Sequence, residues 1–130
     1  MLPTAPFRKA ASHDEVARQV QLVLWHNQPP LPKLERRYET RYPFPHPIRL
    51  VPVDDEGKPC GESIVVLGKD LSEYGLGFYH NEPLAERRMM AIFDCGPLQA
   101  QIVLELTWCR FGSHGLFENG GRFLEALTAA

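Results

Sequence analysis

The sequence predicts a mainly β protein, a small closed six-stranded antiparallel β-barrel preceded by one N-terminal α-helix. The chain of 130 residues is long enough for one domain with a modest core. A helical apolar pattern occurs near the N-terminus, and six apolar stretches of 6 to 13 residues follow, separated by short turns. We expect an N-terminal tail and helix over residues 1–33 and the barrel domain over residues 34–130.

The predicted helix begins at Ser12, an N-cap that Glu15 completes as a capping box. It should end near Asn27, because Pro29 and Pro30 follow. Its apolar face packs either on the barrel of the same chain or on a second copy or partner protein. That face is formed at helical spacing by Val16, Val20, Val23 and Leu24. We expect residues 1–11 to form a loose tail.

Residues 28–47 form a proline-rich arm, which we expect to be extended or irregular. The arm carries Arg36, Arg37 and Arg41. An arm with few packing anchors can be mobile alone and become ordered when a ligand binds. The alternative is a solvated loop in which neighbouring glutamates balance the arginines.

Six apolar strands are predicted after the arm, and the third and fifth show alternating apolar residues. We expect Trp108 and Phe123 in the core, and alternation places Tyr74 on the same face of its strand as Leu76 and Phe78. Val103 interrupts the polar face of the fifth strand. The strands are Ile48–Val53, Glu62–Gly68, Tyr74–His80, Arg87–Phe93, Leu98–Arg110 and Leu116–Leu124.

The stretch from Asp70 to Phe78 reads as a turn that leads into a strand. Asp70 and Ser72 carry oxygens that can bond the nearby backbone or a ligand. Gly75 weakens a strand, so it marks a bulge, a bend or the close approach of another group. Arg37 and Arg41 lie four positions apart and fall on the same side of an extended arm.

The order Arg37-x-x-x-Arg41 followed by Asp70-x-Ser72-x-x-Gly75 resembles the two-part signature of PilZ domains. These domains are bacterial receptors for the second messenger cyclic di-GMP. The resemblance runs from about Leu34 to Leu124. It implies a six-stranded barrel and a signalling receptor or adaptor whose arginine-rich arm folds over the ligand on the barrel surface. The residues that it assigns to the ligand are Arg36, Arg37, Arg41, Asp70, Ser72 and Gly75.

Arginine suits this ligand because its planar fork pairs with phosphate or with guanine O6 and N7, and it also stacks on purines. Asp70 can accept bonds from guanine N1 and N2 or orient an arginine. In PilZ domains the residue before the first motif arginine bears on ligand stoichiometry. Arg36 stands at this position, so the resemblance implies an intercalated pair of ligand molecules rather than a single one. The alternative function is a PilZ-like protein–protein interaction module that does not bind nucleotide.

Composition and spacing argue against other classes of function. A net charge of −2 argues against binding a nucleic acid polymer or an anionic membrane, and the sequence contains no apolar run of about 18 residues. Residues 1–11 do not resemble a signal peptide, so we expect a cytoplasmic protein, a monomer or homodimer with a protein partner. The dispersed histidines form no catalytic motif, so we expect no enzyme and no cofactor.

The three cysteines are too few and too scattered for a disulfide framework. We expect reduced, partly buried thiols and no metal site. The alternative is a zinc site built from Cys60, Cys95 and a histidine.

Overall fold

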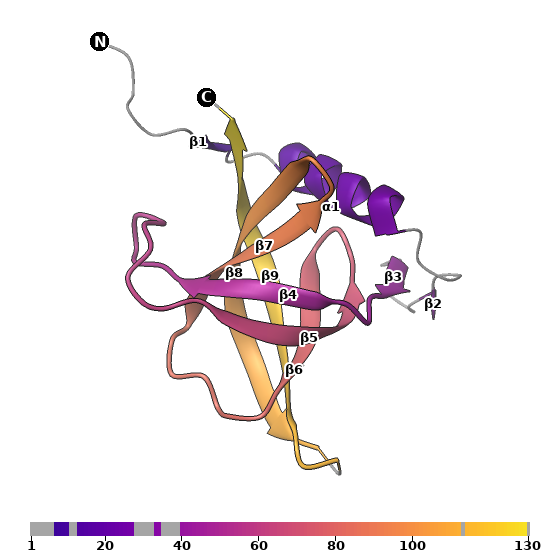
Figure 1. Cartoon of the computed structure of the whole chain (residues 1–130), viewed down its shortest axis with the longest axis vertical. Helices are drawn as coiled ribbons and strands as arrows, with labels where there is room; N and C mark the ends of the chain where they lie inside the picture. The colour runs from indigo at the N-terminus through magenta and orange to yellow at the C-terminus, as the bar shows by residue number, and fades with distance from the viewer. Residues whose placement is uncertain (1–6, 11–12, 28–32, 35–39, 113, 130) are drawn as a thin grey trace.

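The computed structural model describes residues 7–10, 13–27, 33–34, 40–112 and 114–129. A closed six-stranded antiparallel barrel with one N-terminal helix confirms the predicted fold class (Figure 1). The strands are bonded in the order β9-β8-β7-β4-β5-β6, and β6 pairs back with β9 to close the barrel. They are β4 (Pro47–Pro52), β5 (Ile64–Leu71), β6 (Gly75–His80), β7 (Arg88–Cys95), β8 (Leu98–Phe111) and β9 (Phe117–Ala129).

Each predicted strand coincides with one barrel strand, and the ends differ by a few residues. The largest difference at the candidate site is in β5, which continues past the predicted end at Gly68 to Leu71. A register shift between Gly68 and Asp70 marks a bulge there. Asp70 therefore lies on a strand and pairs with Gly77, and the turn begins only after Leu71.

Three short strands were not predicted. β1 (Phe7–Ala10), expected in a loose tail, pairs with β9. The arm contributes β2 (Lys33–Leu34) and β3 (Thr40–Pro43), and β3 pairs with the end of β5. These strands depend on their partners, because none of them has an alternating pattern of its own. The predicted N-cap Ser12 and residues 35–39 lie outside the described residues.

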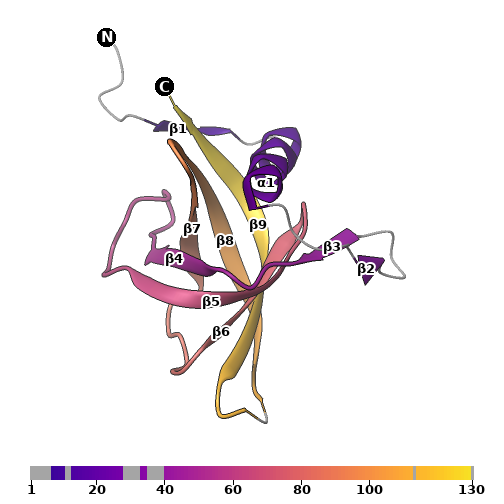
Figure 2. The ribbon, with the colours of Figure 1, turned by 45° about the vertical axis from the view of Figure 1, so that its right-hand side comes forward.

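The helix α1 (His13–Asn27) packs with its predicted apolar face on the barrel of its own chain. It contacts β7, β8 and β9, and Figure 2 shows it beside β9. Its buried residues are Val16, Val20, Val23 and Leu24. Within the described part of the chain, no helix has the length and apolar character needed to cross a membrane.

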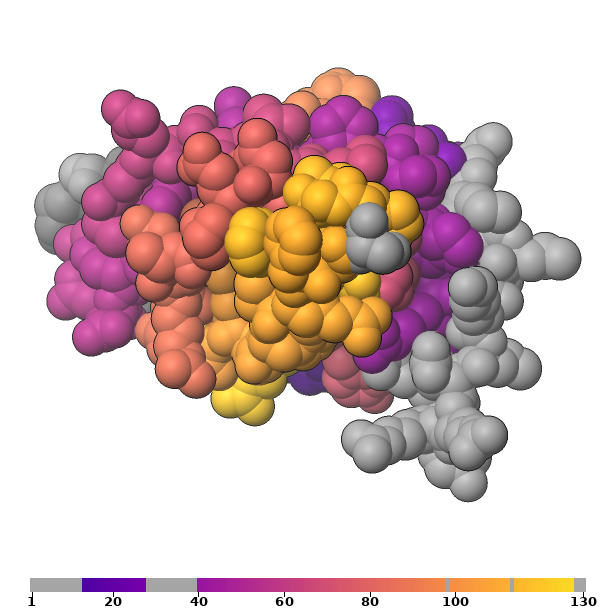
Figure 3. All heavy atoms as spheres, turned by 90° about the horizontal axis from the view of Figure 1, so that it is seen from below, coloured from indigo at the N-terminus to yellow at the C-terminus, as the bar shows by residue number. Residues whose placement is uncertain are grey.

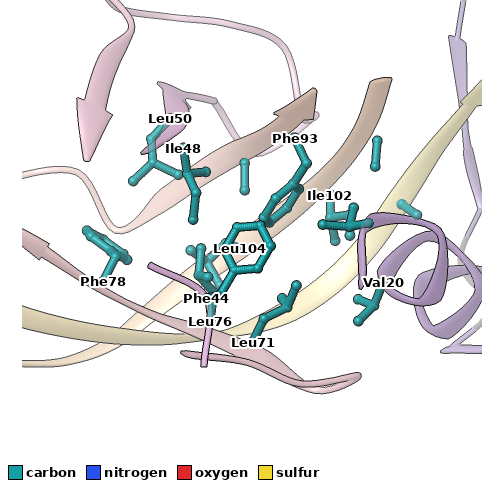
Figure 4. Packing of buried hydrophobic residues seen from close by; sticks show 14 of the residues in the cluster. Val20, Phe44, Ile48, Leu50, Leu71, Leu76, Phe78, Phe93, Ile102 and Leu104 are labelled. Atoms are coloured by element: carbon teal, nitrogen blue, oxygen red, sulfur yellow. The ribbon is translucent and has the colours of Figure 1, made fainter. Parts of the chain in front are cut away.

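One hydrophobic core joins α1 to the barrel. Figure 4 shows Val20 of α1 in the same cluster as Phe78, Phe93 and Ile102 of the strands. Phe123, predicted in the core, is partly buried and packs against this cluster. The other labelled members are Phe44, Ile48, Leu50, Leu71, Leu76 and Leu104.

Val103 is buried in a second, smaller cluster with Val53, Met90 and Ile92. It lies on the opposite face of β8 from Ile102 and Leu104, which belong to the main core. This cluster explains the apolar residue that interrupts the predicted polar face.

Two aromatic side chains do not lie where alternation predicts them. Trp108 is 43% exposed, because a bulge in the β8–β9 ladder between Leu106 and Trp108 shifts the alternation by one residue. Tyr74, predicted on the same face as the buried Leu76 and Phe78, is 55% exposed, because it lies in the turn before β6, and its ring stacks on His13 of α1. The prediction of Trp108 as a core residue was therefore wrong.

The packing of α1 predicts that Val20→Ala lowers the free energy of unfolding by about 2 kcal/mol, since the change deletes two buried methyl groups. Val20 is fully buried, whereas Val65 on β5 is 65% exposed. The matched control Val65→Ala should change stability by less than about 0.5 kcal/mol. Urea denaturation of both variants measures the difference. If the two variants were equally stable, the packing of Val20 on the barrel would not contribute to the free energy of unfolding, and the prediction would be wrong.

Candidate functional site

The candidate site lies on the outer surface of the barrel, across four neighbouring strands. Two of them, β8 and β9, form the orange to yellow surface at the centre of Figure 3. The strand register aligns Asp70 of β5 with Gly77 of β6, Gly120 of β9 and Trp108 of β8. Side chains alternate along a strand, and Leu76 and Phe78 on either side of Gly77 are buried. The row formed by Asp70, Gly77, Gly120 and Trp108 therefore faces outward.

The two glycines in this row leave space that their neighbours occupy. A Cβ atom at Gly77 would lie 2.6 Å from Asp70 Oδ1, and one at Gly120 would lie 2.2 Å from Trp108 Cε2. Neither position can carry a side chain while the carboxylate and the indole stay in place. The result is a glycine floor, formed by Gly77 and Gly120, between a carboxylate on one side and an aromatic ring on the other.

A pocket of about 230 Å³ opens over the glycine floor. Its charged side chains are two arginines and one carboxylate, so cationic groups predominate. Pockets that enclose a small ligand are typically about 300–1,000 Å³, so the described residues would enclose only part of a larger ligand. The lining residues are Arg41, Asp70, Ser72, Tyr74, Gly75, Leu76, Gly77, Thr107, Trp108, Gly120, Gly121 and Arg122.

The structure brings Arg41 to Asp70, two residues that the sequence assigned to one site. Arg41 lies on β3, and its Nη1 is 3.7 Å from Asp70 Oδ2. Pairing of Pro43 with Asp70 aligns the two strands so that this contact can form. Arg36 and Arg37, the other two predicted arginines, lie outside the described residues.

Ser72 shapes the rim of the pocket by holding the turn between β5 and β6. Its Oγ accepts hydrogen bonds from the backbone N–H groups of Tyr74 at 3.0 Å and Gly75 at 3.1 Å. Its own N–H donates to the carbonyl of Gly75 at 3.0 Å. Ser72 is buried, so its clearest role is to fix the turn from which neighbouring groups reach the pocket.

Gly75 is required by the neighbouring strand. A Cβ atom there would lie 2.2 Å from the carbonyl oxygen of Gly121 on β9. The sequence suggested the close approach of a ligand at this glycine, whereas the structure shows the close approach of backbone. Gly75 thus contributes to the site by letting β6 and β9 meet beneath it.

Helix α1 supports the same turn from the side. The Gln21 amide donates to Glu73 Oε2 at 3.1 Å, and the His13 and Tyr74 rings stack with centroids 4.8 Å apart. Tyr74 also lines the pocket. The N-terminal helix is therefore in direct contact with the rim of the candidate site.

Sequence reasoning missed the side of the pocket built by β8 and β9. Trp108 was assigned to the core, and neither Gly120 nor Arg122 was assigned to the site. Arg122 Nε lies 3.1 Å from Glu105 Oε1, which holds this second arginine at the edge of the pocket. The available signal was the pair of adjacent glycines at 120 and 121, because such a pair inside a strand indicates close approach by another group.

A buried carboxylate lies in the next outward row. Glu118 is 8% exposed and pairs with Lys69 and with Arg110, whose Nη2 is 3.3 Å from Glu118 Oε1. We call these three residues the Glu118 cluster. The hydrogen bond from Lys69, followed by that from Arg110, holds the pKa of Glu118 below its usual range despite burial. Glu118 is therefore ionised at neutral pH.

The cysteines do not gather with other metal-binding side chains in the described ranges. Cys95 is buried, and burial raises the pKa of its thiol, whereas Cys60 and Cys109 are exposed. Among the described residues, no three His, Cys, Asp or Glu side chains lie close enough to hold a metal ion. The alternative zinc site has no support in this part of the chain.

Comparisons with protein-family models, curated proteins and solved structures found no match. The description of this protein therefore depends on its fold and its candidate site. The chain is a six-stranded antiparallel barrel with an N-terminal helix and a cationic, partly aromatic surface pocket.

The Glu118 cluster predicts a stability that depends on pH. Folding lowers the pKa of Glu118, so ionised Glu118 stabilises the folded state. This stabilisation is complete above the pKa of glutamate in the unfolded chain and is lost as the pH falls through the pKa of Glu118 in the folded chain. At neutral pH, Glu118→Gln should lower the free energy of unfolding by about 1.5–3 kcal/mol. The difference from the native chain should shrink between about pH 5 and pH 3, as measured by urea denaturation.

The control for this prediction is Glu56→Gln, because Glu56 pairs with Lys58 and both side chains are 74% exposed. This change should have little effect at any pH. If the loss of free energy of unfolding in Glu118→Gln stayed constant down to pH 3, the ionised carboxylate of Glu118 would not be the source of the stabilisation.

Proposed function

We propose that this protein is a PilZ-type receptor that binds cyclic di-GMP and performs no chemistry. One observation carries the proposal. The ion pair of Arg41 and Asp70 faces Trp108 across the glycine floor, within one pocket. These residues offer a charged fork, a carboxylate acceptor and an aromatic ring, a combination suited to a nucleotide with purine bases and phosphates.

Each group in the pocket has a chemical counterpart in the ligand. Arg41 can pair with a phosphate or with guanine O6 and N7, and Asp70 can accept from guanine N1 and N2. The Trp108 ring is available for stacking on a base, a contact worth about 1–3 kcal/mol in nucleic-acid complexes. Because Gly77 and Gly120 carry no side chain, the Asp70 carboxylate and the Trp108 indole can lie close to the backbone at the base of the pocket.

The arm supplies the remaining cations in this proposal. Arg36 and Arg37 precede Arg41 by five and four positions in the sequence, and we propose that the arm folds them over the ligand. The volume of the described pocket is below that of pockets that enclose a small ligand completely. This is consistent with a site that the arm completes. As expected from Arg36, we propose an intercalated pair of ligand molecules at each site.

The signal would pass to a protein partner through the surface that the ligand reorganises. The Gln21–Glu73 and His13–Tyr74 contacts link the pocket rim to α1, so the helix is placed to respond to occupancy. We propose that this occurs in the cytoplasm of a bacterium, in a monomer or homodimer, without a nucleic acid polymer or membrane as partner.

The alternative is a PilZ-like interaction module that does not bind nucleotide. Two neighbouring outward side chains on β5, Val65 and Leu67, favour it, because they are 65% and 47% exposed. Such a pair can form part of a protein contact, although scattered apolar residues are common on protein surfaces.

Isothermal titration calorimetry with cyclic di-GMP tests the proposed function. We expect a Kd in the micromolar range or below and a stoichiometry of two ligand molecules per site. Arg41→Ala and Arg37→Ala should each weaken binding roughly tenfold or more, because each removes a charge-assisted contact of about 1.5–3 kcal/mol.

The matched control is Arg49→Ala, since Arg49 is exposed on β4 outside the pocket. It should leave the affinity unchanged. Binding that Arg41→Ala does not weaken would overturn the assignment of the site. An absence of heat, together with no thermal stabilisation at high ligand concentration, would favour the interaction module.

A further inference from the structure

Trp108 is a half-exposed aromatic ring that lies on a floor without side chains. The indole lies against the backbone of Gly120, where a Cβ would be 2.2 Å from its Cε2 and Nε1, and the residue is 43% exposed. An exposed ring of this kind can change rotamer on the picosecond to nanosecond timescale. A wall for stacking must instead keep one orientation, because ordering the ring during binding costs free energy.

One contact restrains this ring from outside the pocket. The guanidinium carbon of Arg110 lies over the Trp108 ring, 5.7 Å from its centroid, within the range of a cation–π interaction. Trp108 lines the pocket, whereas Arg110 is not among the described residues that line it. Arg110 therefore contacts the Trp108 ring without lining the pocket.

Arg110 is itself anchored by a buried charge. Its Nη2 lies 3.3 Å from Glu118 Oε1 and 3.4 Å from Oε2, so the guanidinium faces both carboxylate oxygens. Lys69 bonds the same carboxylate from β5. The Arg110 side chain is 69% exposed, whereas that of Glu118 is only 10% exposed, so the carboxylate is the fixed end of the pair.

We propose that Arg110, tethered to Glu118, is a positioning residue that holds the Trp108 ring as a preformed wall of the ligand pocket. The inference deepens the proposed function and takes the identity of the ligand from it. It assigns to the Glu118 cluster a role in affinity, although no member of the cluster lines the pocket. Arg110 acts through the ring and does not itself contact the ligand.

The first experiment measures the ring without any ligand. The chain has two tryptophans, so Trp25→Phe leaves Trp108 as the only reporter, and Trp25 is 81% exposed. In this background, Arg110→Ala and Glu118→Gln should each increase local ring motion in fluorescence anisotropy decay and increase quenching by acrylamide. Arg18→Ala is the matched control, because Arg18 pairs with Glu15 and its side chain is 75% exposed. It should change neither signal.

The second experiment is a double-mutant cycle on affinity for cyclic di-GMP. Arg110→Ala should weaken binding about twofold to fivefold, because this factor corresponds to the free energy of one exposed cation–π contact. In a Trp108→Ala background, the same change should have no effect, because the ring through which Arg110 acts is gone. Circular dichroism confirms that each variant is folded.

The outcomes separate this inference from the proposed function. Unchanged ring motion in Arg110→Ala would overturn the inference, as would a loss of affinity that persists in the Trp108→Ala background. If the native chain does not bind cyclic di-GMP, the proposed function fails, and the ring measurements alone decide whether Arg110 positions Trp108.

Discussion

The close pairing of β6 with β9 is the constraint on which the barrel and its pocket both depend. This pairing runs from Gly75 opposite Arg122 to His80 opposite Phe117, and it closes a sheet that would otherwise have two free edges. Gly75 permits the approach because any Cβ there would meet the carbonyl oxygen of Gly121. The pocket floor lies on the same two strands, so the residues that close the barrel also define the site.

Much of the fold was predictable because its signals are local. Short apolar stretches bounded by turn residues identified all six barrel strands, and apolar residues at helical spacing identified the face of α1 that packs on them. Two features were not predictable from alternation. The bulge before Trp108 reverses the side on which that ring emerges, and β1 pairs with the end of β9 that continues beyond its pairing with β6.

The candidate site was predictable on one side. The motif residues Arg41 and Asp70 come together through β3 and β5, as their order in the sequence indicated. The opposite side depends on the register of β8 against β9, which places Trp108 over Gly120. That register follows from long-range pairing and carries no local pattern. The bulge at Lys69 has a similar effect, because it directs Lys69 to Glu118 and leaves its neighbour Asp70 in the pocket.

The position of the pocket across the β6–β9 pairing links ligand binding to the folding reaction. The two strands are far apart in sequence, so their pairing is a non-local contact of the kind that slows folding. A molecule held between Asp70 and Trp108 recognises only the closed barrel, because these residues are neighbours only when β6 and β9 are paired. Its binding free energy therefore adds to the free energy of unfolding. Occupancy should thus slow amide hydrogen exchange most strongly along β6 and β9, where transient opening would separate the two halves of the site.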